Sequence, residues 1–179
     1  MKLRKNRSGG KGFSATIRNH MKYLWSPWRM KYIENSKVEG CIFCMAYDSE
    51  DGPDNLIAYR GERAYVILNR YPYTSGHLMV VPFAHKPNLE ELDAETRAEM
   101  MELTTRCMTI LRKIYNPPAF NMGANIGEAA GAGVKAHVHI HIVPRWAGDT
   151  NFMSTIGQAR VLPELLEDTY QRVKNAFQG

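Results

Sequence analysis

The sequence lacks any long hydrophobic run. Although 44% of its 179 residues are hydrophobic, no apolar stretch approaches the ~20 residues that a membrane-spanning helix needs. We therefore expect no membrane partner. No internal repeat is present and nothing suggests two domains, so we expect a single domain over 21–179.

Acidic residues are absent from the first twenty positions, which carry six basic residues. Without these six charges the formal net charge falls from +5 to −1. The basicity therefore belongs to an arm over 1–20, and the near-neutral remainder argues against a nucleic-acid partner. The arm has no hydrophobic segment of the secretory type. We expect a disordered tail, or an upstream start with Met21 as the natural beginning; a transit peptide or a nucleic-acid-contacting arm is the alternative.

Cysteine is scarce, with three residues in the whole chain. This number excludes a secreted disulfide framework and favours a reducing cytoplasm. Cys41 and Cys44 form a Cys-x-x-Cys pair, which is half of a tetrahedral zinc site and needs two more ligands. A redox-active or merely buried pair is the alternative, but no βαβ pattern surrounds it. Cys107 lies on an apolar helical stripe and is expected to be a buried small hydrophobe.

Histidines alternate with aliphatic residues in the segment His137-Val138-His139-Ile140-His141-Ile142-Val143. Successive side chains of an extended chain point to opposite faces, so the segment predicts a strand with one wet histidine face and one core face. Neighbouring histidines would stand roughly 6.6 Å apart, which suits a phosphate, or a shared metal if the strand twists. The alternative without a function is that these are three surface histidines on an edge strand.

A neutral imidazole can attack phosphorus and hold it covalently, which divides a hard displacement into two easier ones. One ring nitrogen stays bare when the other donates to a carbonyl group. The three-glycine segment 127–133 precedes the histidines and offers backbone N–H groups for phosphate oxygens. The residues therefore favour a phosphoryl or nucleotidyl site.

Local patterns predict the remaining elements. Ser26 and Pro27 open a short helix, and Asp93 caps a long amphipathic helix over Ala94–Tyr115 that ends at two prolines. The predicted strands are 56–59 and 64–68, joined by a hairpin at Gly61-Glu62, then 77–82 and 120–126. A stripe from Leu162 to Phe177 predicts a C-terminal helix. The stripe of the long helix comprises Met100, Leu103, Cys107, Met108, Leu111 and Ile114.

These residues resemble the histidine triad, or HIT, superfamily. The segment 137–143 matches its His-φ-His-φ-His-φ-φ signature, where φ is hydrophobic. Gly76-His77-Leu78-Met79-Val80-Val81-Pro82 looks like the second family motif, and 41–44 is similar to a cysteine pair in many bacterial members. Two stretches, 24–30 and 143–153, resemble the bacterial diadenosine tetraphosphate phosphorylase branch. The resemblance covers about 24–157.

The resemblance implies an α+β fold of HIT type, with an antiparallel sheet of about five strands, a long helix and a C-terminal helix. It implies a homodimer that binds a purine mono- or dinucleotide and cleaves it at the α-phosphorus. His139 would be the nucleophile, His141 would contact the phosphate and assist the leaving group, and His77 would support the site from behind. The implied nucleotide and phosphate contacts are Asn69, Asn125, Gly131, Gly133, His141 and Trp146.

Zinc-bearing relatives imply a ligand set of Cys41, Cys44, His85 and His137. Four protein ligands without an open position describe a structural zinc ion, because catalytic zinc keeps a water. We expect no organic cofactor. Under this reading the first triad histidine serves zinc and the middle one makes the covalent bond.

One departure from the family concerns the reaction. Dinucleotide-hydrolase and phosphoramidase members usually carry Gln or Ser just before the triad, whereas 131–134 reads Gly-Ala-Gly-Val. This favours phosphorolysis of diadenosine tetraphosphate to ADP and ATP over hydrolysis to AMP and ATP. The alternatives are a purine-nucleotide-binding regulatory protein with incidental phosphoramidase-like activity, and a zinc-dependent nucleic-acid binder, which would need a basic face.

Overall fold

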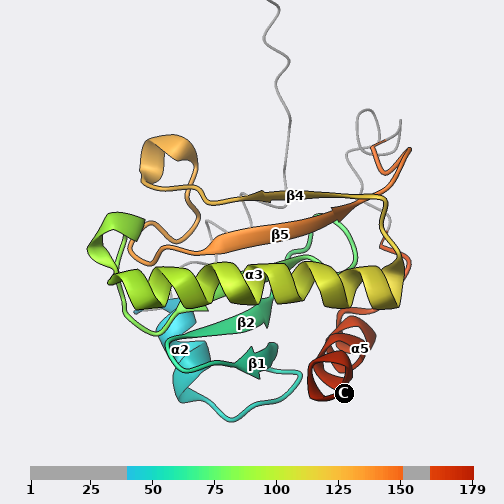
Figure 1. Ribbon diagram of the computed structural model, residues 1–179, viewed down its shortest axis with the longest axis horizontal. Coiled ribbons are helices and arrows are strands. Elements are labelled where there is room, and N and C mark those ends of the chain that lie inside the picture. The colour runs from blue at the N-terminus through green and yellow to red at the C-terminus, as the bar shows by residue number, and fades with distance from the viewer. Residues whose placement is uncertain (1–39, 151–161) are drawn as a thin grey trace, which may run out of the picture.

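The structure is a computed structural model that describes residues 40–150 and 162–179. A five-stranded antiparallel sheet in the order β1-β2-β3-β5-β4 forms its centre, with helices around it (Figure 1). The predicted α+β class, with a long helix and a C-terminal helix, is confirmed. The arm over 1–20 and the helix expected at Ser26 lie outside the described residues. The strands are β1 (Ile57–Arg60), β2 (Ala64–Leu68), β3 (Leu78–Pro82), β4 (Ala119–Gly123) and β5 (Ile140–Arg145), and the helices are α2 (Ile42–Asp48), α3 (Ala94–Tyr115) and α5 (Leu166–Gln178).

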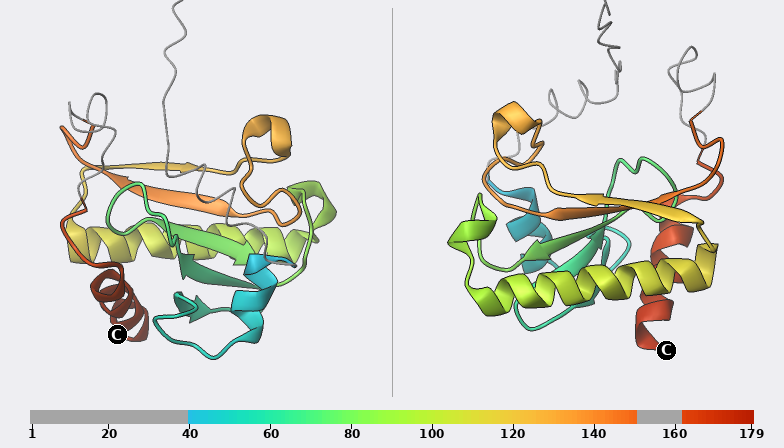
Figure 2. Two further views of the ribbon diagram at one scale, coloured as in Figure 1. Left: turned by 180° about the vertical axis from the view of Figure 1, so that it is seen from behind. Right: turned by 45° about the horizontal axis from the view of Figure 1, so that its top comes forward.

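Helix α3 has the predicted bounds. The Asp93 side chain accepts a hydrogen bond from the Thr96 amide at 2.7 Å, which satisfies one of the free N–H groups of the first turn. Asn116 ends the helix in the left-handed region, with φ of 45°, and two prolines follow. The buried stripe packs α3 across one face of the sheet (Figure 2). Its buried residues are Thr96, Met100, Leu103, Thr104, Cys107, Ile110 and Leu111.

Strand β5 lies inside the sheet, between β3 and β4. Met79 of β3 pairs with His141, and Gly123 of β4 pairs with the same histidine from the other side. The alternative of surface histidines on an edge strand is therefore wrong. Both central strands, β2 and β3, are buried along their whole length, so the histidine segment is attached to the rigid core of the molecule.

The expectation of a wet histidine face is also wrong. His137 is 1% exposed and His139 is 4% exposed, because Phe43 of α2 packs against both rings. The regular strand starts at Ile140 rather than at His137. Val138 N donates to the Lys86 carbonyl at 2.7 Å, which keeps the chain extended before the ladder begins. The alternation of the segment is real, but on its histidine face His137 and His139 are buried and His141 is partly buried.

Other element boundaries differ by a few residues. β4 ends at Gly123 rather than 126, where the chain leaves the sheet toward the glycine segment. The C-terminal helix begins at Leu166. Leu162 and Leu165 are exposed and precede it, so the predicted apolar stripe extends beyond the helix at its N-terminal end. The hairpin at Gly61-Glu62 is confirmed, because β1 and β2 pair antiparallel across it.

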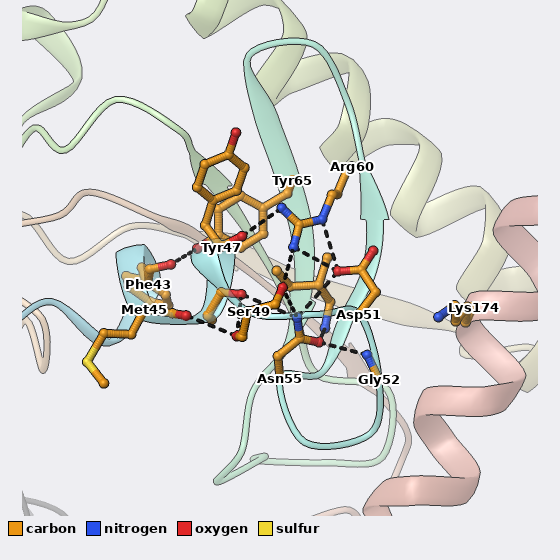
Figure 3. A network of polar contacts seen from close by, with 12 residues as sticks. Phe43, Met45, Tyr47, Ser49, Asp51, Gly52, Asn55, Arg60, Tyr65 and Lys174 are labelled. Carbon is orange, nitrogen blue, oxygen red and sulfur yellow. Dashed lines mark hydrogen bonds and ion pairs between the residues drawn. The ribbon is translucent and has the colours of Figure 1, made fainter.

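Helix α2 contains Cys44 and begins directly after Cys41, in a segment for which the sequence analysis predicted no helix. It lies on the other side of the sheet from α3 (Figure 2). The Tyr65 hydroxyl donates to the Phe43 carbonyl at 2.8 Å and ties α2 to β2. Beyond α2, Arg60 and Asn55 hold the connecting loop through a network of polar contacts (Figure 3). Among the described residues, no helix is long and apolar enough to cross a membrane.

Candidate functional site

Two cysteines and two histidines from separate parts of the chain meet at one point. Cys41 and Cys44 come from the start of α2, His85 follows β3, and His137 precedes β5. Their ligand atoms all lie within 4.8 Å of one another. The structure therefore brings the four predicted ligands together. Among the described residues, no other group of three or more potential metal ligands is found.

The spacing of the cluster fits a tetrahedral ion. The Cys41 Sγ to His137 Nδ1 distance is 3.3 Å, Cys44 Sγ to His85 Nδ1 is 3.2 Å, and Cys44 Sγ to His137 Nδ1 is 3.7 Å. Zinc bond lengths imply ligand separations of about 3.3–3.8 Å at tetrahedral angles. The cluster thus approximates zinc geometry with no open position for a catalytic water.

Protonation of the cluster also fits a metal. His137 Nε2 lies 2.9 Å from the Pro82 carbonyl oxygen, which can only accept, so Nε2 carries the proton and Nδ1 is left bare toward the cysteines. Burial lowers the pKa of His137 and keeps the ring neutral. Burial and the neighbouring Cys41 raise the pKa of Cys44 to about 11, so a bound cation would be needed to hold its sulfur as thiolate.

The middle histidine has the tautomer of a nucleophile. His139 Nδ1 lies 2.9 Å from the His137 carbonyl oxygen, so Nδ1 donates and Nε2 keeps its lone pair. Burial lowers the pKa of His139, which disfavours the protonated ring. Phe43 packs on this ring at 4.8 Å between centroids and fixes its orientation. His139 can therefore offer a neutral, aimed nitrogen to an electrophile.

A chain of hydrogen bonds fixes His141 in the opposite tautomer. The Tyr73 amide donates to His77 Nδ1 at 3.1 Å, which leaves the proton of His77 on Nε2. His77 Nε2 lies 3.0 Å from His141 Nδ1, so Nδ1 of His141 accepts and its Nε2 carries a proton. Burial and the nearby His139 lower the pKa of His141 to about 4. His141 is thus a neutral N–H donor beside the nucleophile, with 4.7 Å between the two ring centroids.

A cavity of about 670 Å³ opens over these two histidines. This volume lies within the usual range for small-molecule sites. Of the predicted nucleotide contacts, the structure brings Asn69, Asn125, Gly131 and Gly133 to its wall together with His139 and His141. His77 contacts His141 through the hydrogen bond at 3.0 Å, and its supporting role in the site remains a prediction.

Trp146 is the predicted contact that the structure does not bring to the cavity among the residues it describes. It follows the far end of β5, roughly 16 Å along the extended chain from His141, in a turn where its amide donates to Asp149 at 3.1 Å. A site role for Trp146 remains a prediction.

The sequence missed several cavity residues. Phe43 lies between Cys41 and Cys44 in the sequence. Its ring contacts His139 because this segment forms helix α2. Tyr73 donates its backbone amide to His77, a group that every residue but proline supplies, and its ring packs on that of His77 at 4.8 Å between centroids. Other missed residues that line the cavity include Ile42, Met45, Glu50, Asp54, Arg70 and Tyr71.

Sequence and fold together define the class of protein. The HIT domain family model matches residues 51–148, more than half of the chain. The chain therefore belongs to the HIT family.

Individual relatives narrow the comparison. The AP-4-A phosphorylase of Mycobacterium tuberculosis is 37% identical over 160 residues, which cover 85% of this chain and 82% of that protein. A zinc-bound histidine triad family protein from Mycobacterium smegmatis superimposes with a TM-score of 0.62 at 28% identity, over 78% of this chain and 94% of that one. A hypothetical histidine triad nucleotide-binding protein from Sulfolobus tokodaii gives a TM-score of 0.61 at 27% identity, over 77% and 92% of the two chains.

Proposed function

We propose that the protein is a nucleotidyl-transferring enzyme that cleaves a dinucleoside polyphosphate of the diadenosine tetraphosphate type. The observation that carries this proposal is the bare Nε2 of His139 beside the N–H donor of His141 in one nucleotide-sized cavity. The similarity to the AP-4-A phosphorylase of Mycobacterium tuberculosis supports the choice of substrate.

The reaction has two displacements at one phosphorus atom. His139 Nε2 attacks the α-phosphorus, the bond from phosphorus to the bridging oxygen breaks, and ATP leaves while adenosine monophosphate stays on the histidine. An oxygen of inorganic phosphate then attacks the same phosphorus, releases ADP and restores the neutral ring. Water in place of phosphate would release AMP.

Neighbouring groups assist through hydrogen bonds. His141 Nε2–H is suited to donate to the phosphate or to the departing oxygen, and His77 holds it in that tautomer. The Asn69 and Asn125 side chains would hold ribose or phosphate oxygens, and the backbone at Gly131 and Gly133 would come close to phosphate. None of these contacts requires a charged histidine.

Cys41, Cys44, His85 and His137 would hold a structural zinc ion, which supplies a cross-link between α2 and the start of the histidine segment and takes no part at phosphorus. The fit of the donor set and the zinc-bound relative support this assignment. A reducing cytoplasm would keep the two cysteines available as ligands.

We further propose a single domain over 21–179 that pairs as a homodimer through β4. This edge strand is exposed at Ala119, Asn121, Met122 and Gly123, and its outer side pairs with no strand among the described residues. Edge strands offer a row of N–H and C=O groups to a second chain, and a two-fold axis closes such a pair.

Product analysis with and without phosphate tests the proposed reaction. The protein is incubated with diadenosine tetraphosphate, and the nucleotides are separated by chromatography. We expect ADP and ATP with phosphate present and at least ~10-fold slower turnover without it. Equal rates in both arms with AMP and ATP as products would exclude phosphorolysis and leave a hydrolase, whereas no cleavage in either arm would contradict the proposed function.

A further inference from the structure

We infer that Arg70 binds the phosphates beyond the α-phosphate and so makes the site selective for a polyphosphate chain. This inference rests on the proposed function and assigns a specificity-determining residue within the same cavity. The inference starts from the charge of the cavity wall. The two histidines of the wall are neutral, so they supply no positive charge to balance a phosphate chain.

Arg70 is the one permanently charged cation among the described residues that line the cavity. Glu50 and Asp54 line it as well and carry negative charge. His141 donates a hydrogen bond but is neutral at pH 7, because its pKa is about 4. A triphosphate leaving group carries several negative charges, and of these groups only the Arg70 guanidinium can offset them.

The charge of Arg70 is not neutralised by a carboxylate. Exposed arginines elsewhere form ion pairs, as Arg63 does with Glu95 and Arg172 with Glu164. Within the described part of the chain Arg70 makes no such pair; its Nη2 donates to the backbone carbonyl of Asp54. That contact uses one of the five N–H donors of the Arg70 guanidinium. Because a carbonyl oxygen carries no formal charge, the positive charge of Arg70 is not neutralised.

The backbone is held in place on both sides of the contact between Arg70 and the Asp54 carbonyl. The Asn69 side chain accepts from the Tyr71 amide at 2.9 Å and shapes the turn that carries Arg70. Asp54 belongs to a strap, residues 49–55, that is tied down by two side chains (Figure 3). Arg60 donates to the Ser49 carbonyl, and buried Asn55 accepts from the Gly52 amide at 3.2 Å.

The strap and the turn at 69–71 form the cavity wall together with His139 and His141. A phosphate chain that starts at the His139 nitrogen must leave along this wall. Guanidinium recognises phosphate oxygens through paired N–H groups, so we expect β- and γ-phosphates to contact Arg70 while the α-phosphate stays with the histidines.

Calorimetric titration of the full chain with AMP and with ATP tests the inference without turnover. For the wild type we expect tighter binding of ATP than of AMP. In Arg70→Ala, the ATP Kd should rise about 10-fold while the AMP Kd changes less than about twofold, as expected for loss of a charge-assisted hydrogen bond. Arg70→Lys should recover part of the loss because it keeps a point charge.

Arg97→Ala is the matched control. Arg97 is also exposed and donates to a backbone carbonyl, that of Leu92, but it does not line the cavity; its ATP and AMP affinities should equal those of the wild type. If Arg70→Ala weakens AMP and ATP equally, or keeps the preference for ATP, the inference is wrong and the proposed function stands. If the wild type binds neither nucleotide, both fail.

Discussion

Two backbone groups decide how the triad histidines differ. The Pro82 carbonyl takes the Nε2 proton of His137, while the His137 carbonyl takes the Nδ1 proton of His139. The first histidine therefore presents Nδ1 to the cysteines, and the second presents Nε2 to the cavity. Two chemically identical side chains acquire separate tasks, metal binding and nucleophilic attack, from the acceptor that each one meets.

The partly buried, neutral state of His141 predicts a loss of stability in acid. Its pKa is about 4 in the folded protein against about 6.5 unfolded. Between these values the unfolded chain binds more protons, so stability falls as the pH falls from about 6.5 to 4. Chemical denaturation at several pH values should show wild type losing up to about 3 kcal/mol more than His141→Asn.

The His141→Asn variant isolates this effect, because both proteins keep the zinc ligands and their titration. Zinc content must be matched before denaturation. Parallel pH curves for the two proteins would contradict a neutral, partly buried His141.

Helix α2 and strand β5 couple the two halves of the site at the level of elements. Phe43 belongs to α2 and packs on the rings of both His137 and His139. The cysteines at the start of α2 face the histidine that precedes β5. A zinc ion at this cluster would therefore hold the ring that orients the nucleophile.

Cys41→Ser tests this coupling. With one of four ligands weakened, we expect zinc affinity to fall at least ~10-fold and the free energy of unfolding to decrease by more than about 2 kcal/mol. Metal analysis of the purified protein and chemical denaturation measure the two effects.

Cys107→Ser is a control that keeps zinc, since Cys107 is buried on α3 away from the cluster. Unchanged zinc content in Cys41→Ser would contradict the four-ligand assignment.

Local patterns predicted helix α3 to the residue, because the Asp93 cap and the Pro117-Pro118 stop act on neighbouring backbone. Through the family resemblance, the motifs also indicated the four residues that meet at the metal cluster and, apart from Trp146, the expected nucleotide contacts that line the cavity, but not the rest of its wall. They missed helix α2 and the burial of His137 and His139. Those features depend on Phe43 of α2 packing on the rings of His137 and His139, which is tertiary packing and leaves no local periodicity.

At the scale of the whole molecule, the proposed dimer depends on the exposed edge of β4. If β4 pairs with its copy, the protein should elute with the mass of two chains. Light scattering after size exclusion measures this mass. Met122→Pro should shift the mass toward one chain, because the register with β5 leaves the Met122 N–H on the outer edge of β4, and proline removes that group.

A mild exposed change such as Lys113→Ala is the suitable comparison and should keep the mass of the wild type. A wild type with the mass of one chain at micromolar concentration would contradict the proposed dimer.

A covalent nucleotidyl-histidine at His139 is the central claim. The direct measurement is mass spectrometry of protein mixed briefly with diadenosine tetraphosphate and then quenched, followed by peptide mapping. We expect one added adenylyl group on His139, which phosphate discharges as ADP, and no adduct in His139→Asn, although that variant retains its zinc. An adduct on another residue, or turnover by His139→Asn at the rate of the wild type, would contradict it.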